Sequence, residues 1–204
     1  MNFFNISENL QKLDLDARAL IAKETAARDE ITRYNQHKVL RAFINNKVSE
    51  AHFAASTGYG YGDRGREVIE AVFAEITGAQ SALFRHNFVS GTHALTVALF
   101  GVLRPNDKML ILTGRPYDTL IGVLGCDQKT DGSLADFGII TEQIDLDQNG
   151  KPQYDLIAKK IKDGGYKAAY IQRSRGYTMR PSLCIDEIEK LTNTIKSADP
   201  NTAI

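Results

Sequence analysis

Short apolar runs alternate with helical segments along the second half of the chain. Of all features of the sequence, this alternation most restricts the folds that the chain can adopt. The runs are too short for buried helices, and each is followed by a stretch of helical spacing. The three runs are Met109–Leu112, Ile139–Ile144 and Ala168–Gln172, and the helical stretches are Thr119–Leu124, Tyr154–Lys162 and Ile185–Ile195. This rhythm predicts an α/β fold with a mostly parallel sheet covered on both faces.

The first part of the chain, from Met1 to about Lys47, is predicted to form a helical arm. No Pro or Gly lies between Ser7 and Asn35, apolar residues recur at helical spacing, and Ser7 is a suitable N-cap. A second helical stretch, Lys38–Lys47, carries apolar residues on one face. Such arms often pack on a neighbouring domain or subunit.

A glycine-rich loop follows the arm. Residues 56–66 hold four glycines, so they cannot form a helix interior. A helix with an apolar stripe from Val68 to Ile76 should end at Gly78, and a strand-like run at Ala82–Phe84 should precede a helix over Ala94–Leu103. We therefore divide the chain into the arm with its loop, residues 1–62, and the first part of an α/β domain, residues 63–204. The final residues are typical of the approach to a further strand, so we expect the chain to continue.

Composition excludes several classes of protein. The 25 Lys and Arg balance the 25 Asp and Glu, which argues against nucleic-acid binding. No run of about 18 apolar residues exists to cross a membrane, and the N-terminus lacks the parts of a secretory signal. Cys126 and Cys184 have neither metal-ligand spacing nor a CxxC pair, which indicates reduced thiols in a cytoplasmic protein without a metal site.

Gly60–Gly65 matches the dinucleotide-binding pattern GxGxxG, but its context is wrong. That pattern requires a preceding strand and an acidic residue about 20 positions later. Ser49–Ser56 is not a buried strand, and Arg85 and His86 stand near the downstream position. An oxidoreductase that binds NAD(P) is therefore a weak alternative.

Three polar clusters stand where an α/β sheet binds ligands, after strand-like segments. The cluster Ser90-Gly91-Thr92 precedes a helix, where free N–H groups bind phosphate; the alternative is that Ser90 only caps the helix. Tyr117 could stack on a flat ring or simply pack in its loop. Arg173 and Arg175 suit a carboxylate or phosphate, unless water solvates them. Together the clusters indicate an anionic ligand that carries a ring.

With these residues in view, the sequence resembles the aluminium-resistance protein family, a pyridoxal-phosphate branch related to methionine gamma-lyase and cystathionine-metabolising enzymes. The resemblance covers essentially the whole chain. Its motifs are Ser56–Tyr61, Ser90–Ala94, Ala98–Pro105, Gly114–Thr119 and Ile171–Tyr177. It implies an aspartate-aminotransferase-like fold, the truncated large domain of a pyridoxal-phosphate-dependent transferase, and a carbon–sulfur lyase that acts on a sulfur amino acid.

The resemblance also implies roles for individual residues. A tyrosine and an arginine of the glycine-rich loop would reach the cofactor phosphate of a neighbouring subunit. The first polar cluster would bind the phosphate, Tyr117 would stack on the ring, and the third cluster would contact cofactor or substrate. These residues are Tyr59 or Tyr61 with Arg64, then Ser90, Gly91 and Thr92, and finally Arg173, Ser174 and Arg175. A homo-oligomer with shared active sites, a homotetramer, is the implied assembly.

Two groups that the cofactor needs are missing. The resemblance implies that the Schiff-base lysine and the aspartate against the pyridinium nitrogen lie beyond Ile204. No lysine in the chain is a credible substitute, including Lys159, Lys160, Lys167 and Lys196. We therefore expect this chain to be inactive alone. The alternative is a cofactor-free oligomerising or interaction domain.

Overall fold

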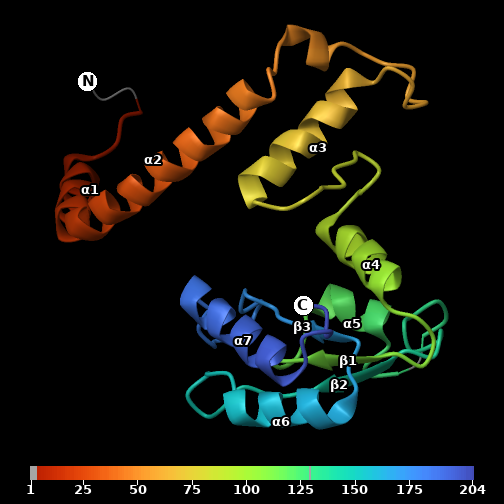
Figure 1. Cartoon of the computed structure of the whole chain (residues 1–204). Helices are drawn as coiled ribbons and strands as arrows, with labels where there is room; N and C mark the ends of the chain where they lie inside the picture. The colour runs from red at the N-terminus through yellow and green to blue at the C-terminus, as the bar shows by residue number, and fades with distance from the viewer. Residues whose placement is uncertain (1–3, 129) are drawn as a thin grey trace. The chain divides into compact units, whose positions relative to one another are not determined.

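The computed structural model describes residues 4–128 and 130–204, and there the apolar runs of the second half form a parallel sheet. The strands are β1 (Lys108–Ile111), β2 (Ile140–Gln143) and β3 (Ala168–Tyr170), in the order β2-β1-β3 (Figure 1). Lys108 is in register with Ile140, and Met109 is in register with Ala168. Ala203 adds one isolated parallel bridge to Ala168. The predicted mixed α/β class with a parallel sheet is confirmed.

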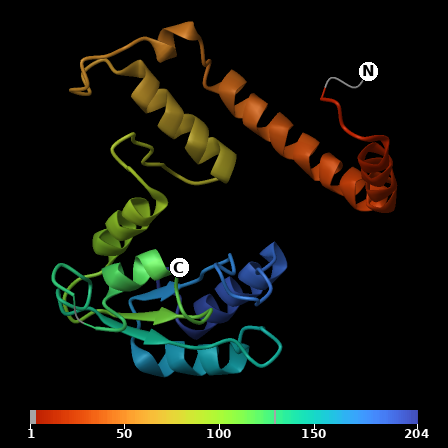
Figure 2. The same cartoon turned by 180° about the vertical axis from the view of Figure 1, so that it is seen from behind.

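Helices cover both faces of this sheet because side chains alternate along its strands. Leu110 packs on one side with α6 (Tyr154–Gly164) and α7 (Ile185–Ala198). Met109 and Ile111 pack on the other with α5 (Asp118–Leu124) and with Leu103, which ends α4 (Gly91–Val102). The two views agree that α5 and α6 lie on opposite sides of the sheet (Figures 1 and 2). The strand ends are therefore fixed by two buried apolar layers.

The chain falls into two compact units, Met1–His86 and Asn87–Ile204, and the sheet belongs to the second. The first unit contains α1 (Glu8–Leu20), α2 (Ala22–Asn45), a 3₁₀ turn at Glu50–Phe53 and α3 (Arg64–Thr77). The side chains of Asn45 and Asn46 donate to Glu75 at 2.7 and 2.8 Å, which ties the end of α2 to α3. The division of the sequence after residue 62 stays a prediction.

The helical arm is confirmed, but its break is not where the sequence predicted it. The helices separate at Ile21, and α2 continues through Asn35 to Asn45. Asn35 lies inside α2, and its side chain donates to the carbonyl of Ile31 at 2.9 Å, one turn earlier. Ser7 does occupy the N-cap position of α1, although its side chain makes no capping bond.

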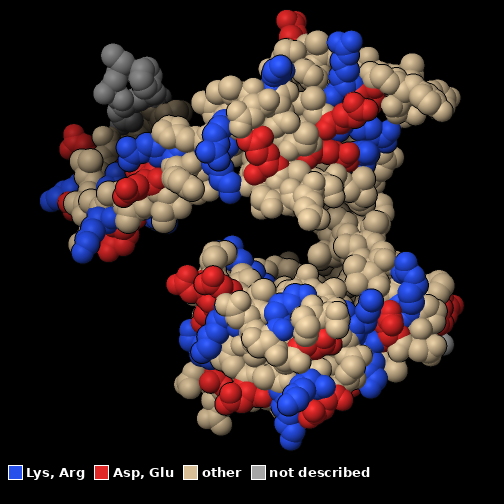
Figure 3. Space-filling model, in the orientation of Figure 1, with Lys and Arg blue, Asp and Glu red and all other residues tan. Residues whose placement is uncertain are grey.

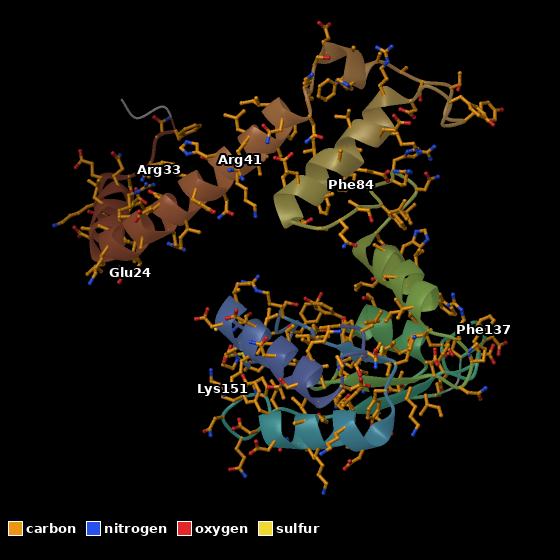
Figure 4. The ribbon with its side chains drawn as sticks, in the orientation of Figure 1. Glu24, Arg33, Arg41, Phe84, Phe137 and Lys151 are labelled. Atoms are coloured by element: carbon orange, nitrogen blue, oxygen red, sulfur yellow. The ribbon has the colours of Figure 1, made fainter. Side chains whose placement is uncertain are left out.

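The run Ala82–Phe84 is not a strand. The backbone N–H of Phe84 donates to Glu70 at 2.9 Å, and the ring of Phe84 packs 5.1 Å from that of Phe73 (Figure 4). Phe84 of this run thus packs on α3 instead of in the sheet, whereas Leu83 stays 62% exposed. The predicted end of α3 at Gly78 is confirmed, with φ of 69° in the left-handed region.

Among the described residues no helix is long and apolar enough to cross a membrane.

Candidate functional site

At the N-terminus of α4, two backbone N–H groups have no acceptor among the described residues. Ser90 is the N-cap: its Oγ accepts the N–H of His93 at 3.1 Å, and its carbonyl accepts the N–H of Ala94 at 3.1 Å. The two groups without an acceptor are the N–H groups of Gly91 and Thr92, which lie in the first turn of the helix, where no carbonyl of the same helix can accept them. A Cβ at Gly91 would meet no described atom within 4 Å. The capping role of Ser90 is therefore confirmed, and the geometry also leaves room for an anion at this helix end.

A hydrogen bond joins this helix end to the start of α5. Thr92 Oγ1 donates to Thr119 Oγ1 at 3.1 Å, and Tyr117 is the residue that precedes α5. The hydroxyl of Tyr117 in turn hydrogen-bonds the hydroxyl of Ser174. Three of the residues chosen from sequence, Thr92, Tyr117 and Ser174, are thereby linked through Thr119 across three separate segments of the second unit. This chain of contacts is the candidate site.

The two arginines beside Ser174 do not take part in these contacts. Arg173 and Arg175 are exposed, whereas Ser174 between them is half-buried. Binding of a substrate by Arg173 and Arg175 stays a prediction.

Sequence reasoning missed three polar residues that organise the site. Gln172 accepts the N–H of Tyr117, Thr113 accepts the N–H of Gln172, and Arg180 donates to the carbonyls of Gln172 and Ser174. Gln172 lies just past β3, not within the strand as predicted. The position of Gln172 and Thr113 directly after buried strands was the available signal; Arg180 gave none, because its partners are backbone carbonyls.

The glycine-rich loop belongs to the first unit and is organised by Asp63. This residue caps α3 by accepting the N–H of Arg66 at 3.1 Å, and its other oxygen accepts the hydroxyl of Ser56 at 2.9 Å. Tyr59 and Tyr61 are 82% and 89% exposed, and Arg64 is the first residue of α3. The exposed tyrosines are available to another molecule, but their role at a cofactor stays a prediction.

A cavity of about 480 Å³ also lies at the carboxyl ends of the strands, lined by Thr113–Arg115 and by residues 146–150 and 178–181. Its charged groups already have partners. Arg115 forms two bonds to Asp127, at 2.9 and 2.7 Å, and its guanidinium holds the pKa of that carboxyl below its usual range. Asp147 accepts the N–H of Lys151 at 2.7 Å. Arg180 donates to backbone carbonyls, so the charged side chains that line this cavity are each held in place by hydrogen bonds within the protein.

Two further features bear on cofactors and metals. Lys160 pairs with Glu142, and Lys196 donates to the carbonyls of Pro200 and Thr202, so both have structural partners. Within residues 4–128 and 130–204, no group of three or more His, Cys, Asp or Glu side chains could hold a metal ion.

Comparison with known proteins gives a consistent set of relatives. A family model described as methionine gamma-lyase matches residues 10–204. YnbB of Bacillus subtilis (strain 168), a protein named as uncharacterized, is 42% identical over 200 residues, which are 97% of this chain and 47% of that protein.

Two solved structures are similar along nearly the whole chain. One, from Clostridium acetobutylicum, is named as a candidate cystathionine beta-lyase involved in aluminum resistance; it is 43% identical with a TM-score of 0.91, over 99% of this chain and 48% of that one. The other is a carbon-sulfur lyase involved in aluminum resistance from Clostridium novyi NT, 43% identical with a TM-score of 0.89, over 97% of this chain and 47% of that one. The chain thus spans about half the length of the relatives it matches.

Proposed function

This chain belongs to the methionine gamma-lyase family, and from that premise we propose that the full-length protein is a pyridoxal-phosphate-dependent carbon–sulfur lyase acting on a sulfur amino acid. The names of the similar clostridial structures support the lyase activity. The proposal includes an aspartate-aminotransferase-like fold for the full-length protein, a cytoplasmic homotetramer as its assembly, and the first half of the cofactor site within this chain.

The observation that carries the proposal is the open N-terminus of α4 beside Tyr117. A phosphate group suits this helix end because the Gly91 and Thr92 N–H groups are free to donate and the helix dipole favours negative charge. Gly91 has no Cβ, and nothing of the described chain fills the space where one would lie. Thr92 bonds Thr119, which follows Tyr117 by two residues, so the loop that carries this aromatic residue is tied to the same helix end. These residues fit a ligand with a phosphate and a flat ring.

Each residue then has a physical task. Pyridoxal phosphate, when bound, supplies an electron-withdrawing ring for an amino acid attached to it. Ser90 keeps the α4 terminus in place, and Gly91 and Thr92 bind the phosphate. Tyr117 covers one face of the ring and excludes water from it.

The remaining predicted residues act on substrate and on a neighbouring subunit. Arg173 and Arg175 bind the carboxylate of the amino acid, and Ser174 holds the Tyr117 hydroxyl. Tyr59 or Tyr61, together with Arg64, reaches the phosphate of a second subunit. The exposure of both tyrosines supports an intermolecular role.

The test is a titration of pyridoxal phosphate into full-length Gly91→Val, followed by absorbance. The added side chain should block the approach of the phosphate to two charge-assisted hydrogen bonds, each worth about 1.5–3 kcal/mol, so we expect affinity to fall by about 100-fold or more. The fold should persist because the space around Gly91 is open.

The matched control is Gly101→Val, in the same helix and with equally open surroundings. It should bind the cofactor as the unmodified protein does. Equal affinity in both variants would show that Ser90 only caps a helix. Absence of binding by the unmodified protein would favour the cofactor-free interaction domain instead.

A further inference from the structure

The side chain of Gln172 bridges two loops at the carboxyl edge of the sheet. Its Oε1 accepts the backbone N–H of Tyr117 at 3.0 Å, and its Nε2 donates to the carbonyl of Ser174 at 3.1 Å. Its backbone N–H donates to Thr113 Oγ1 at 3.0 Å. One residue therefore ties the β1–α5 loop, which carries Tyr117, to the β3–α7 loop, which carries Ser174.

Because Gln172 and Thr113 are buried, the hydrogen bonds of this bridge restrict where the two loops can lie. Gln172 is 6% exposed and Thr113 is 1% exposed, so neither can exchange its protein partners freely for water. A buried amide that loses a partner is left with the cost of its desolvation and no compensating hydrogen bond. Among the described residues, no buried side-chain nitrogen or oxygen lacks a partner. The amide is thus held in one orientation by groups on both loops.

Arg180 and Gly176 complete the same arrangement. The Arg180 guanidinium donates to the carbonyls of Gln172 and Ser174 at 3.2 and 2.6 Å, which closes the β3–α7 loop on itself. A Cβ at Gly176 would lie 3.2 Å from the ring of Tyr117, so the ring packs on bare backbone. Tyr117 is therefore restrained at its N–H by Gln172, at its ring by Gly176 and at its hydroxyl by Ser174.

We propose that Gln172 is a positioning residue, which fixes the backbone of Tyr117 so that the ring and the Ser174 hydroxyl keep one relative placement. The expected consequence for the cofactor rests on the proposed function, because it requires Tyr117 to cover the cofactor ring. The positioning of Tyr117 itself does not require a cofactor, so the two statements can be tested apart.

The experiment compares full-length Gln172→Met with Gln153→Met, measuring hydrogen exchange at the Tyr117 amide in the cofactor-free protein. Methionine keeps the length of the side chain and removes both hydrogen bonds. Loss of the bond to the Tyr117 N–H should speed hydrogen exchange at this amide by about 10-fold. It should also weaken the binding of pyridoxal phosphate by roughly 3- to 10-fold. Gln153 donates to the carbonyl of Asp145 on another loop, so its variant should leave both quantities unchanged.

A second variant separates positioning from general damage and keeps the test open if Gln172→Met fails to fold. Gln172→Glu retains an oxygen for the Tyr117 N–H, and Arg180 donates to the same Ser174 carbonyl, so a positive group lies beside the new carboxylate. Exchange at Tyr117 should return to the unmodified rate in this variant.

The outcomes distinguish the two proposals. Unchanged exchange at Tyr117 in Gln172→Met, or equal acceleration in Gln153→Met, overturns the positioning role whatever the cofactor does. Faster exchange in a protein that does not bind pyridoxal phosphate supports the positioning role and overturns the proposed function.

Discussion

Gly176 has a φ of 61°, in the left-handed region, and lies against the ring of Tyr117. An alanine there would suffer backbone strain of about 1–2 kcal/mol. It would also meet Tyr117 Cε1 at 3.2 Å, which forces the ring to move. We expect Gly176→Ala to lower the free energy of unfolding by roughly 2–3 kcal/mol, measured by urea denaturation.

Gly132→Ala separates the two causes. Gly132 also has a positive φ, 79°, but a Cβ there would meet no described atom within 4 Å. Gly132→Ala should therefore lower the free energy of unfolding only by the backbone strain. Equal losses at the two glycines would mean that the contact between Gly176 and the Tyr117 ring has no energetic weight.

Sequence reasoning at this scale found residues by their position after buried runs. Tyr117 and Ser174 were chosen on that ground, and the structure brings their hydroxyls together. Gln172 was assigned to the strand, and Arg180 was not noticed. Gln172 acts on the backbone N–H of Tyr117, 55 residues earlier, and Arg180 acts on backbone carbonyls of its own loop. The sequence carries no mark of such backbone partners. A long polar side chain can be recognised from sequence as a donor, but its acceptor cannot.

At the scale of elements, the N-terminus of α7 depends on Glu187. Its carboxylate accepts the N–H of Cys184 at 3.0 Å and pairs with Lys151, labelled in Figure 4, from the loop that precedes α6. The Lys151 ammonium, followed by the Cys184 N–H, lowers the pKa of Glu187 to about 2. The carboxylate thus closes a capping box at the helix start and joins two elements.

The lowered pKa predicts how stability depends on pH. The contribution of Glu187 should be complete above its unfolded pKa of about 4.3 and should be lost as pH falls from there through its folded pKa of about 2. In Glu187→Gln the part of the stability loss in acid that comes from Glu187 should be absent. The thermal midpoint of this variant at pH 7 should be lower than that of the unmodified protein. Glu189→Gln, at an exposed position of the same helix, should keep the unmodified pH profile. Identical profiles in both variants would contradict the role of the ion pair.

The sequence predicted an element well where its apolar side chains pack in only one kind of surrounding. The strands of the second unit each appear close to the expected residues; β1 and β3 are largely buried, whereas the edge strand β2 is partly exposed. The run Ala82–Phe84 was predicted as strand-like because a short apolar run looks the same whether a sheet or a helix covers it. The helix break at Ile21 was missed because neither glycine nor proline marks it.

At the scale of the whole molecule, the chain leaves much apolar surface uncovered. Helix α4 contains no charged residue and none of its residues is buried, and the surface over it in Figure 3 carries neither sign of charge. A helix that is apolar all round is normally buried. Along α2, Val39, Leu40, Phe43 and Ile44 are 37–65% exposed on the face that the sequence predicted to be apolar. An exposed apolar face of this kind is typical of a surface that binds another chain.

We therefore expect the full-length protein to be an oligomer in which the apolar face of α2 contacts another subunit. Leu40→Glu should shift the mass measured by light scattering toward smaller species, because a carboxylate would have to be desolvated in the contact. Lys38→Glu also adds a carboxylate, but two residues away and so about 200° around the helix, and it should leave the mass unchanged. A mass unaltered by Leu40→Glu would mean that this face is covered by other residues of the same subunit, and intersubunit contact by the arm would then have to be abandoned.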